Sequence, residues 1–244
     1  MRSILILASA IALTGCNMKA GAHEEGDRDP GPVTQRAFPV GAFDSVSLGG
    51  SHTVIVKVGP AASVRAEGPA AVLDRLEIAV KDGDLHIGTK RRDGIHFGFR
   101  KHTPVTITIT TPSLAAAAIG GSGDIRIDRV EGEKFSGSIG GSGDMEIAAL
   151  KVSEADFSIA GSGGIRAAGS AGKASVSIAG SGDVDISGLE SKVATVSVVG
   201  SGDVQAKAME SADVSIMGSG DVAMTGTAKC NVSKMGSGDV RCAN

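Results

Sequence analysis

The chain has 244 residues, 41% of them hydrophobic, and carries a formal net charge of −3. Glycine occurs 36 times, whereas tryptophan and tyrosine are absent, so the interior of any folded domain must be aliphatic. This composition argues against general disorder and against an electrostatic nucleic-acid binder, and three cysteines are too few for a disulfide-rich scaffold.

The first residues have the features of an export signal. Arg2 precedes an apolar run from Ile4 to Leu13, which is too short to span a bilayer. The run ends in Leu13-Thr14-Gly15-Cys16, which resembles the bacterial lipobox. That resemblance implies that residues 1–15 are a lipoprotein signal peptide and that Cys16 carries the lipid anchor, with palmitate among its acyl chains. The alternative is an ordinary secretory signal with a coincidental cysteine.

Residues 16–35 are rich in Gly, Pro, Asp and Glu and have no apolar periodicity, which predicts a flexible tether. The residue directly after Cys16 is Asn17 and not an aspartate. By resemblance to proteobacterial sorting rules this favours the outer membrane, with the periplasmic and surface faces both left open.

Residues 89–103 interrupt the alternating pattern of the following region with a basic insertion. It contains five cationic side chains around Ile95, Phe97 and Phe99. The five cationic residues are Lys90, Arg91, Arg92, Arg100 and Lys101. Such a patch suits an anionic partner such as lipopolysaccharide, a phospholipid headgroup or an acidic glycan, and the alternative is a solvated hairpin.

The motif Gly-Ser-Gly-Asp, or a close variant, then occurs seven times at intervals of 18 to 20 residues. Its serines are Ser122, Ser142, Ser162, Ser181, Ser201, Ser219 and Ser237. Apolar residues alternate on both sides of each motif, which predicts two strands with one buried face joined by a sharp corner. A unit this small must stack on its neighbours to bury that face, and it is too short for a propeller blade of about 40 to 45 residues.

Stacking places equivalent residues in columns. We expect two inner columns, Ile119, Ile139, Ile159, Ile178, Val198 and Ile216, and Ile125, Met145, Ile165, Val184, Val204, Val222 and Val240. The repeat also continues backward in degenerate form, because residues 48–54 overlay residues 119–125 and residues 83–85 overlay residues 182–184. The second overlay places Asp84 two coils before Asp124.

The order of these segments resembles the head GIN-domain family of auto-transporter adhesins. The resemblance rests on residues 43–46, 80–85 and 106–114 and the repeated Gly-Ser-Gly-Asp, and it covers about residues 40 to 242. It implies an all-β, right-handed parallel β-helix in the bacterial envelope. We expect this fold over residues 36–244, with about 18 to 20 residues per coil. The family name suggests adhesion and supplies no functional residues.

A column of aspartates is the most conspicuous candidate site. Its members are Asp124, Asp144, Asp183, Asp203, Asp221 and Asp239, interrupted by Gly164. One interpretation is a cation ladder, for which Asp183, Asp203 and Asp221 are weak candidates. The favoured alternative is that the side chains bond backbone groups at each corner. No metal or other cofactor is therefore predicted.

The last coil is marked by two cysteines and a lysine. Cys230 and Cys242 flank it and are expected either to form a disulfide or to remain two buried thiols. Lys234 takes the inner-column position that Ile216 holds one coil earlier. An inward charge of this kind opposes strand pairing at the end of a rod.

The sequence favours a non-enzymatic, adhesin-like envelope lipoprotein that presents a binding surface to a glycan, lipopolysaccharide or envelope protein. Its contact with the membrane would be through Cys16, and no nucleic-acid partner is expected. One alternative is a polysaccharide lyase or hydrolase, disfavoured because the aspartates recur in near-identical surroundings with no loop to build a cleft. Another is a structural or stress-related envelope component with protein partners.

Overall fold

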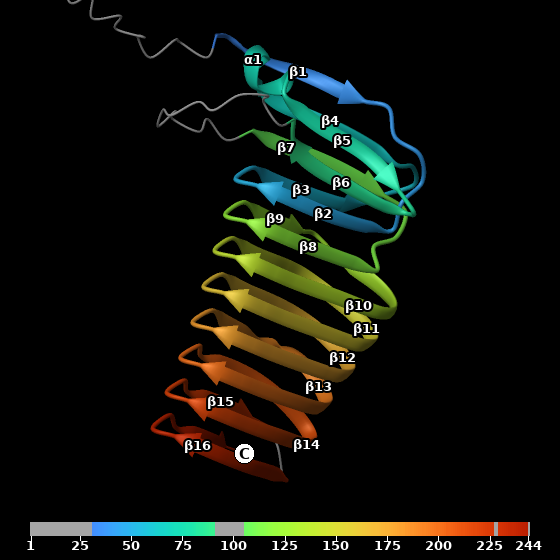
Figure 1. Ribbon diagram of the computed structural model, residues 1–244. Coiled ribbons are helices and arrows are strands. Elements are labelled where there is room, and N and C mark those ends of the chain that lie inside the picture. Colours follow the sequence, from blue (N-terminus) through green and yellow to red (C-terminus); the bar gives the residue numbers. More distant parts are fainter. Residues whose placement is uncertain (1–30, 91–104, 227–228, 244) are drawn as a thin grey trace, which may run out of the picture.

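The computed structural model describes residues 31–90, 105–226 and 229–243, which form a right-handed parallel β-helix (Figure 1). The N-terminal elements are β1 (Val33–Phe38), β2 (Ser45–Gly50), β3 (Thr53–Val58), β4 (Ser63–Pro69), α1 (Ala70–Leu73), β5 (Leu76–Lys81), β6 (Asp84–Thr89) and β7 (Thr106–Thr111). The repeats contain β8 (Ala116–Gly121), β9 (Asp124–Ile127), β10 (Val130–Gly141), β11 (Asp144–Gly161), β12 (Gly164–Gly180), β13 (Asp183–Gly200), β14 (Val204–Gly218), β15 (Val222–Thr225), β16 (Cys230–Gly236) and β17 (Val240–Ala243).

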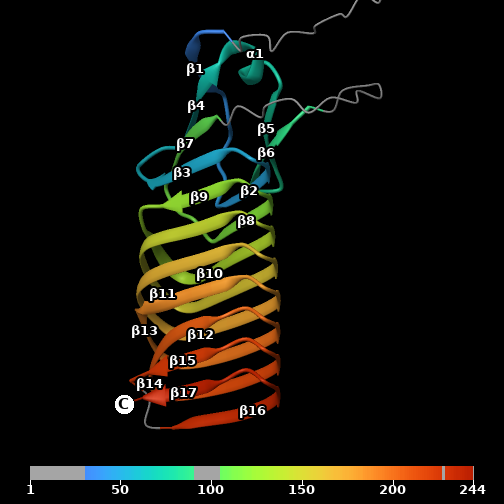
Figure 2. The ribbon, with the colours of Figure 1, turned by 90° about the vertical axis from the view of Figure 1, so that its left-hand side faces the viewer.

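The coils stack along one axis, with β1 and α1 at one end and β16 and β17 at the other (Figure 1, Figure 2). Strands that precede a Gly-Ser-Gly-Asp corner form one side, which we call the serine face; it runs from β2 and β8 through the C-terminal parts of β10 to β14 to β16. Strands that follow the corner form the aspartate face, from β3 and β9 through the starts of β11 to β14 to β15 and β17. A third side closes each coil.

Both predicted inner columns are confirmed by the register. Ile139 pairs with Ile119 and Ile159, and Met145 pairs with Ile125 and Ile165. The repeat members of the columns up to Ile216 and Val222 are each at most 2% exposed. Burial of these aliphatic side chains, at roughly 1.5–3 kcal/mol each, is the main force that holds the coils together.

The N-terminal end departs from the simple repeat. The overlay of residues 48–54 is confirmed, because Leu48 pairs with Ile119 and Gly50 with Gly121. The overlay of Asp84 is wrong: Asp84 pairs with Ser45 on the serine face, not with the column of Asp124. The reason is a hairpin through Asp82 and Gly83, both at positive φ, which reverses the chain between β5 and β6 where a corner of the repeat was expected.

Antiparallel strands therefore form a cap over the first coil. β4 runs antiparallel to both β1 and β7, and β5 runs antiparallel to β6. β1 begins at Val33, three residues before the expected start of the domain at 36, because its backbone pairs with β4 from Val33 to Phe38.

Two phenylalanines enlarge the core in the adjacent coils that lead to the corners at Ser142 and Ser162. Phe135 and Phe157 are at most 2% exposed, and their ring centroids lie 6.4 Å apart at 56°. Gly137 makes room for them, because a Cβ at this position would lie 3.2 Å from Cδ1 of Phe157 and 3.0 Å from Sδ of Met145. The ring of Phe157 thus occupies space that a side chain at Gly137, in register with it on the neighbouring coil, would fill.

Ion pairs bridge adjacent coils on the third side and at its border with the serine face. Nζ of Lys207 lies 2.7 Å from Oε1 of Glu190, and this hydrogen bond and the charge of Lys207 lower the pKa of Glu190. Nζ of Lys134 lies 2.7 Å from Oδ2 of Asp156, and that hydrogen bond and charge raise the pKa of Lys134.

The pair Lys207–Glu190 predicts a measurable pH effect. A carboxyl whose pKa is lower in the folded state stabilises the fold above its unfolded pKa, and this contribution is lost as the pH falls through the folded pKa. Lys207→Gln should therefore raise the pKa of Glu190 towards its ordinary value and weaken the acid dependence of stability. Carbon-detected NMR titration of the Glu190 carboxylate tests this, with Lys192→Gln as the control. An unchanged pKa in Lys207→Gln would contradict the assignment.

Candidate functional site

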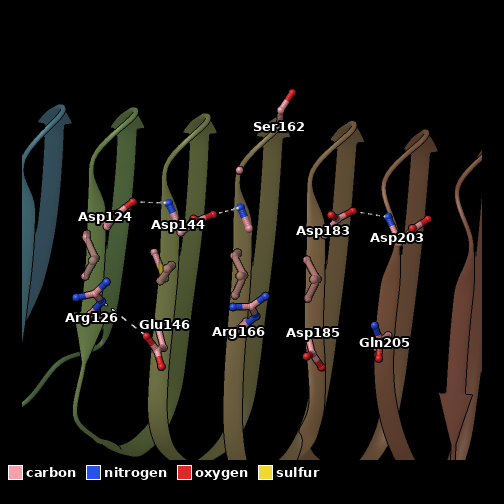
Figure 3. A pocket seen from close by; sticks show the side chains of 16 residues that line it. Asp124, Arg126, Asp144, Glu146, Ser162, Arg166, Asp183, Asp185, Asp203 and Gln205 are labelled. Carbon is pink, nitrogen blue, oxygen red and sulfur yellow. Dashed lines mark hydrogen bonds and ion pairs between the residues drawn. The ribbon is translucent and has the colours of Figure 1, made fainter.

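Each Gly-Ser-Gly-Asp corner requires two glycines for different reasons. Gly161, the first glycine of its corner, has φ of 141°, a conformation that L side chains rarely adopt. Gly163, the second, is stacked so closely on the previous coil that a Cβ would overlap the carbonyl oxygen of Gly143. The serine between them is exposed, as Ser162 is at the tip of its corner (Figure 3). The glycines of the motif are thus explained by backbone packing.

The aspartate after each corner bonds the backbone of the next coil. Oδ1 of Asp124 accepts from N–H of Asp144 at 3.2 Å, and Oδ1 of Asp144 accepts from N–H of Gly164 at 2.9 Å (Figure 3). The same bond joins Asp183 to Asp203 and Asp203 to Asp221, at 3.0 and 2.9 Å. It also joins Asp221 to Asp239 at 2.8 Å. The column is a ladder of side-chain to backbone hydrogen bonds.

This geometry bears directly on the cation interpretation. One oxygen of Asp183, of Asp203 and of Asp221 already accepts a backbone N–H. Within residues 31–90, 105–226 and 229–243, no group of three or more His, Cys, Asp or Glu side chains is arranged to hold a metal ion. Each of these three carboxylates therefore contributes one oxygen to the backbone ladder, which is the kind of bond that the sequence favoured.

A shallow groove opens on the aspartate face where Gly164 interrupts the column. Its volume is about 430 Å³, within the usual range for small-ligand sites. It extends over the starts of β9, β11, β12, β13 and β14 (Figure 3). Six carboxylates and two guanidinium groups line it, contributed by Asp124, Asp144, Glu146, Asp183, Asp185 and Asp203 and by Arg126 and Arg166.

The floor of the groove has a second outward column in which charges alternate. Its members in register are Arg126, Glu146, Arg166, Asp185 and Gln205. Nε of Arg126 lies 3.8 Å from Oε2 of Glu146. Arg166 forms no ion pair or side-chain hydrogen bond with any residue of the described structure, although Glu146 and Asp185 flank it. Its guanidinium is thus available to a ligand directly beside the gap left by Gly164.

The predicted basic insertion is described only at Thr89 and Lys90. Nζ of Lys90 donates to the backbone oxygen of Asp74 at 3.2 Å, and the backbone N–H of Lys90 donates to the oxygen of Arg75. Arg91, Arg92, Arg100 and Lys101 lie outside the described residues. Cys16 and the predicted tether up to residue 30 also lie outside them.

A disulfide joins the two strands of the last coil, β16 and β17. Cys230 in β16 and Cys242 in β17 form a disulfide with Cα atoms 6.6 Å apart, which is the first of the two alternatives open from the sequence. Lys234 is in register with Ile216, as expected, but its side chain is 40% exposed and its Nζ lies 3.7 Å from Oδ1 of Asp239. It turns outward to a carboxylate because no further described coil covers this position.

Sequence reasoning identified Gly164 as a break in the column and missed the groove and Arg166. The available signal was the alternation of charge at the same spacing two residues later, from Arg126 to Asp185. No helix in the described part of the chain is long and apolar enough to cross a membrane.

Comparison with known families decides the classification. Residues 42–228 match the family model described as "Putative auto-transporter adhesin, head GIN domain". The chain belongs to this family. The match runs from β2 to β15, so the resemblance inferred from the motifs is confirmed. No curated protein matches the sequence significantly.

Solved structures of related fold come from Bacteroides fragilis and Parabacteroides distasonis. A structure described as a putative adhesin from Bacteroides fragilis is 22% identical, has a TM-score of 0.81 and is matched over 87% of this chain and 97% of that one. One described as a putative lipid binding protein from Parabacteroides distasonis is 22% identical, with a TM-score of 0.69 over 88% and 97% of the two chains. A putative adhesin from the same organism is 20% identical, with a TM-score of 0.63 over 88% and 98%. At these identities the likeness establishes the common fold.

Proposed function

We propose that the protein is a non-catalytic binding protein of the cell envelope and that the groove over Gly164 receives its ligand. The observation that carries this proposal is the coincidence of two features at one place. The aspartate column loses a side chain at Gly164, and the unpaired guanidinium of Arg166 lies next to the gap in the described structure. Membership of an adhesin-named family supports a binding role.

The mixture of charges in the groove favours a ligand rich in hydroxyl groups. A hydroxyl donates to a carboxylate and accepts from a guanidinium, so one glycan can satisfy both kinds of group. A simple anion would be repelled by six carboxylates, and an apolar ligand would leave them unsolvated. We therefore infer an envelope or host glycan as the ligand class.

The test is retention of the full chain on a panel of envelope and host glycans, with bound material and released fragments measured together, with and without calcium. Retention without cleavage supports the proposal. Release of fragments would assign a polysaccharide lyase or hydrolase instead. Absence of both would overturn the glycan proposal and favour a structural or stress-related role with protein partners. Retention that depends on calcium would restore the cation interpretation of Asp183, Asp203 and Asp221.

Gly164→Asp should abolish glycan retention without unfolding the protein. The new Cβ would lie 2.9 Å from Oδ1 of Asp144, the movable end of a side chain, so the fold should accommodate it. We expect the free energy of unfolding to change by about 1 kcal/mol or less, the scale of repulsion between neighbouring solvated carboxylates. Arg166→Gln should weaken retention at least about tenfold, corresponding to loss of one charged hydrogen bond. Full retention by both variants would exclude the groove.

The basic insertion is a second place at which an anionic ligand could bind. Retention of lipopolysaccharide or an acidic glycan that survives Gly164→Asp and is lost when Arg91, Arg92, Arg100 and Lys101 are replaced by glutamine would assign that ligand to the insertion. Loss in both variants would indicate a shared surface, whereas loss in Gly164→Asp alone would leave the groove as the site.

Anchoring through Cys16 to the outer membrane completes the proposed location. Several acyl chains hold a protein firmly at a bilayer, whereas one chain binds only marginally. Cys16→Ala should therefore move the protein from the membrane fraction to the soluble fraction and abolish labelling by radioactive palmitate. Sucrose-gradient separation of the two membranes tests the outer-membrane assignment. Membrane retention of Cys16→Ala would contradict the lipid anchor.

A further inference from the structure

The serine face differs from the rest of the surface in having almost no charge. Its central outward column consists of Ala118, Ser138, Ser158, Ser177, Ser197, Ser215 and Ser233. From β8 to β16 the outward positions of this face hold only two charged residues, Asp156 and Asp213. Asp156 pairs with Lys134, and Asp213 accepts from the amide of Asn231 at 2.8 Å. Charged side chains are instead concentrated on the other two sides.

A column of glycine and apolar residues runs along the corner edge of this face. In register it reads Gly49, Gly120, Gly140, Ala160, Ala179, Val199, Met217 and Met235. Val199, Met217 and Met235 are 51%, 56% and 68% exposed. Adjacent large apolar side chains left in water are typical of a surface that another molecule covers.

The side chains of this column become larger from Gly49 towards Met235. The column is therefore complementary to the same column of a second copy that runs in the opposite direction. If a second copy lies on it with the rod axis reversed, Met235 meets Gly49 and Met217 meets Gly120. Val199 then meets Gly140, and Ala160 meets Ala179. Every large side chain faces a position without one, so the two surfaces fit at an even separation. A two-fold axis generates this arrangement, since each contact is repeated with the copies exchanged.

The dimensions of the face are sufficient for a stable dimer. Eight rungs are separated by seven spacings of about 4.8 Å, and each rung has six residues at about 3.3 Å per residue. The product of this length and width is about 670 Å² per copy. Two copies would bury about 1,300 Å², within the range of about 1,200–2,000 Å² seen for specific interfaces. The unbroken register of this face from β8 to β16 contrasts with the third side, where the register shifts between Ile147 and Leu150 and between Arg166 and Gly169.

We propose that the serine face is the interface of a homodimer in which two copies of this chain pack antiparallel. The partner is a second copy because the taper fits its own reverse and because the face offers few charges to a charged ligand. The aspartate face and its groove remain open in this dimer, so the proposal is independent of the function proposed above.

Sedimentation velocity of the full chain over a range of concentrations tests the dimer. Met217→Lys should raise the dissociation constant at least tenfold, because it places a charge in an uncharged interface. Met209→Lys is the matched control, since Met209 is 51% exposed, close to the 56% of Met217, but is not in the column, and this variant should dimerise normally. A wild-type protein that is monomeric at all concentrations, or a dimer unaffected by Met217→Lys, would overturn the proposal.

Cysteine cross-linking tests the direction of packing. In a Cys16→Ala background, a mixture of Gly120→Cys and Met217→Cys should form the mixed disulfide under mild oxidation. Met217→Cys alone should not cross-link, because reversal separates the two positions by five rungs, about 24 Å. A disulfide between two Met217→Cys chains would overturn the antiparallel order. Binding of monomers to neutral lipid vesicles, lost in Met217→Lys, would assign the face to a lipid surface instead of a dimer.

Discussion

Gly202→Ala is expected to destabilise the β-helix by about 3 kcal/mol, the upper range for an overpacked site. The alanine Cβ would overlap the carbonyl oxygen of Gly182 and lie 3.0 Å from Cγ2 of Ile178. Neither the carbonyl nor the buried isoleucine can move without separating two coils. Urea unfolding followed by circular dichroism measures the loss.

Two controls isolate the cause. Ser201→Ala changes the exposed neighbour in the same corner and should alter the free energy of unfolding by no more than about 0.5 kcal/mol. Gly140→Ala adds a Cβ that comes no nearer than 3.8 Å to any other atom, the nearest being the backbone oxygen of Ile119. The next coil already has Ala160 at the equivalent position. It should be tolerated. If all three variants were equally stable, the explanation of the motif by close backbone packing would be wrong.

Phe157→Ala is expected to cost about 3–5 kcal/mol, the usual range for removal of a buried aromatic ring. The ring is 2% exposed and packs against Phe135, and the adjacent coils place only Gly137 and Val176 at its position in the column. The cavity cannot collapse easily because the surrounding strands are held by ladder hydrogen bonds on both sides.

A double-mutant cycle with Gly137→Ala makes this prediction specific. Alone, Gly137→Ala should destabilise the protein, because its Cβ would lie 3.2 Å from Cδ1 of Phe157. In the Phe157→Ala background the same change should cost less or stabilise, giving a favourable coupling of about 0.5–3 kcal/mol. Additive effects would show that Gly137 and Phe157 do not share one packing space.

The repeat region could be predicted from sequence because its positions are equivalent. Ile139 and Ile159 face the same environment one coil apart, so spacing alone placed them in one column. The cap could not be predicted in this way. Alternation of apolar residues in β5 and β6 is the same for parallel and antiparallel pairing, and the turn at Asp82 and Gly83 decided the direction and displaced Asp84.

The groove was less accessible to sequence reasoning than the fold. It depends on a missing side chain at Gly164 together with charges on two coils at each side, and only the stacked structure brings these together. The role of the aspartates was easier to anticipate, since a short carboxylate beside a glycine corner commonly bonds backbone groups. Their partner could not be anticipated: the amide belongs to the next coil, 18 to 20 residues later.

The antiparallel cap has a consequence for the order in which the protein folds. Each repeat contacts mainly the adjacent coils, so structure in such a rod grows from whichever segment forms first. The cap precedes the repeats in the chain and is therefore synthesised before them. Later repeats can therefore add to an existing template as they are made, in one direction only.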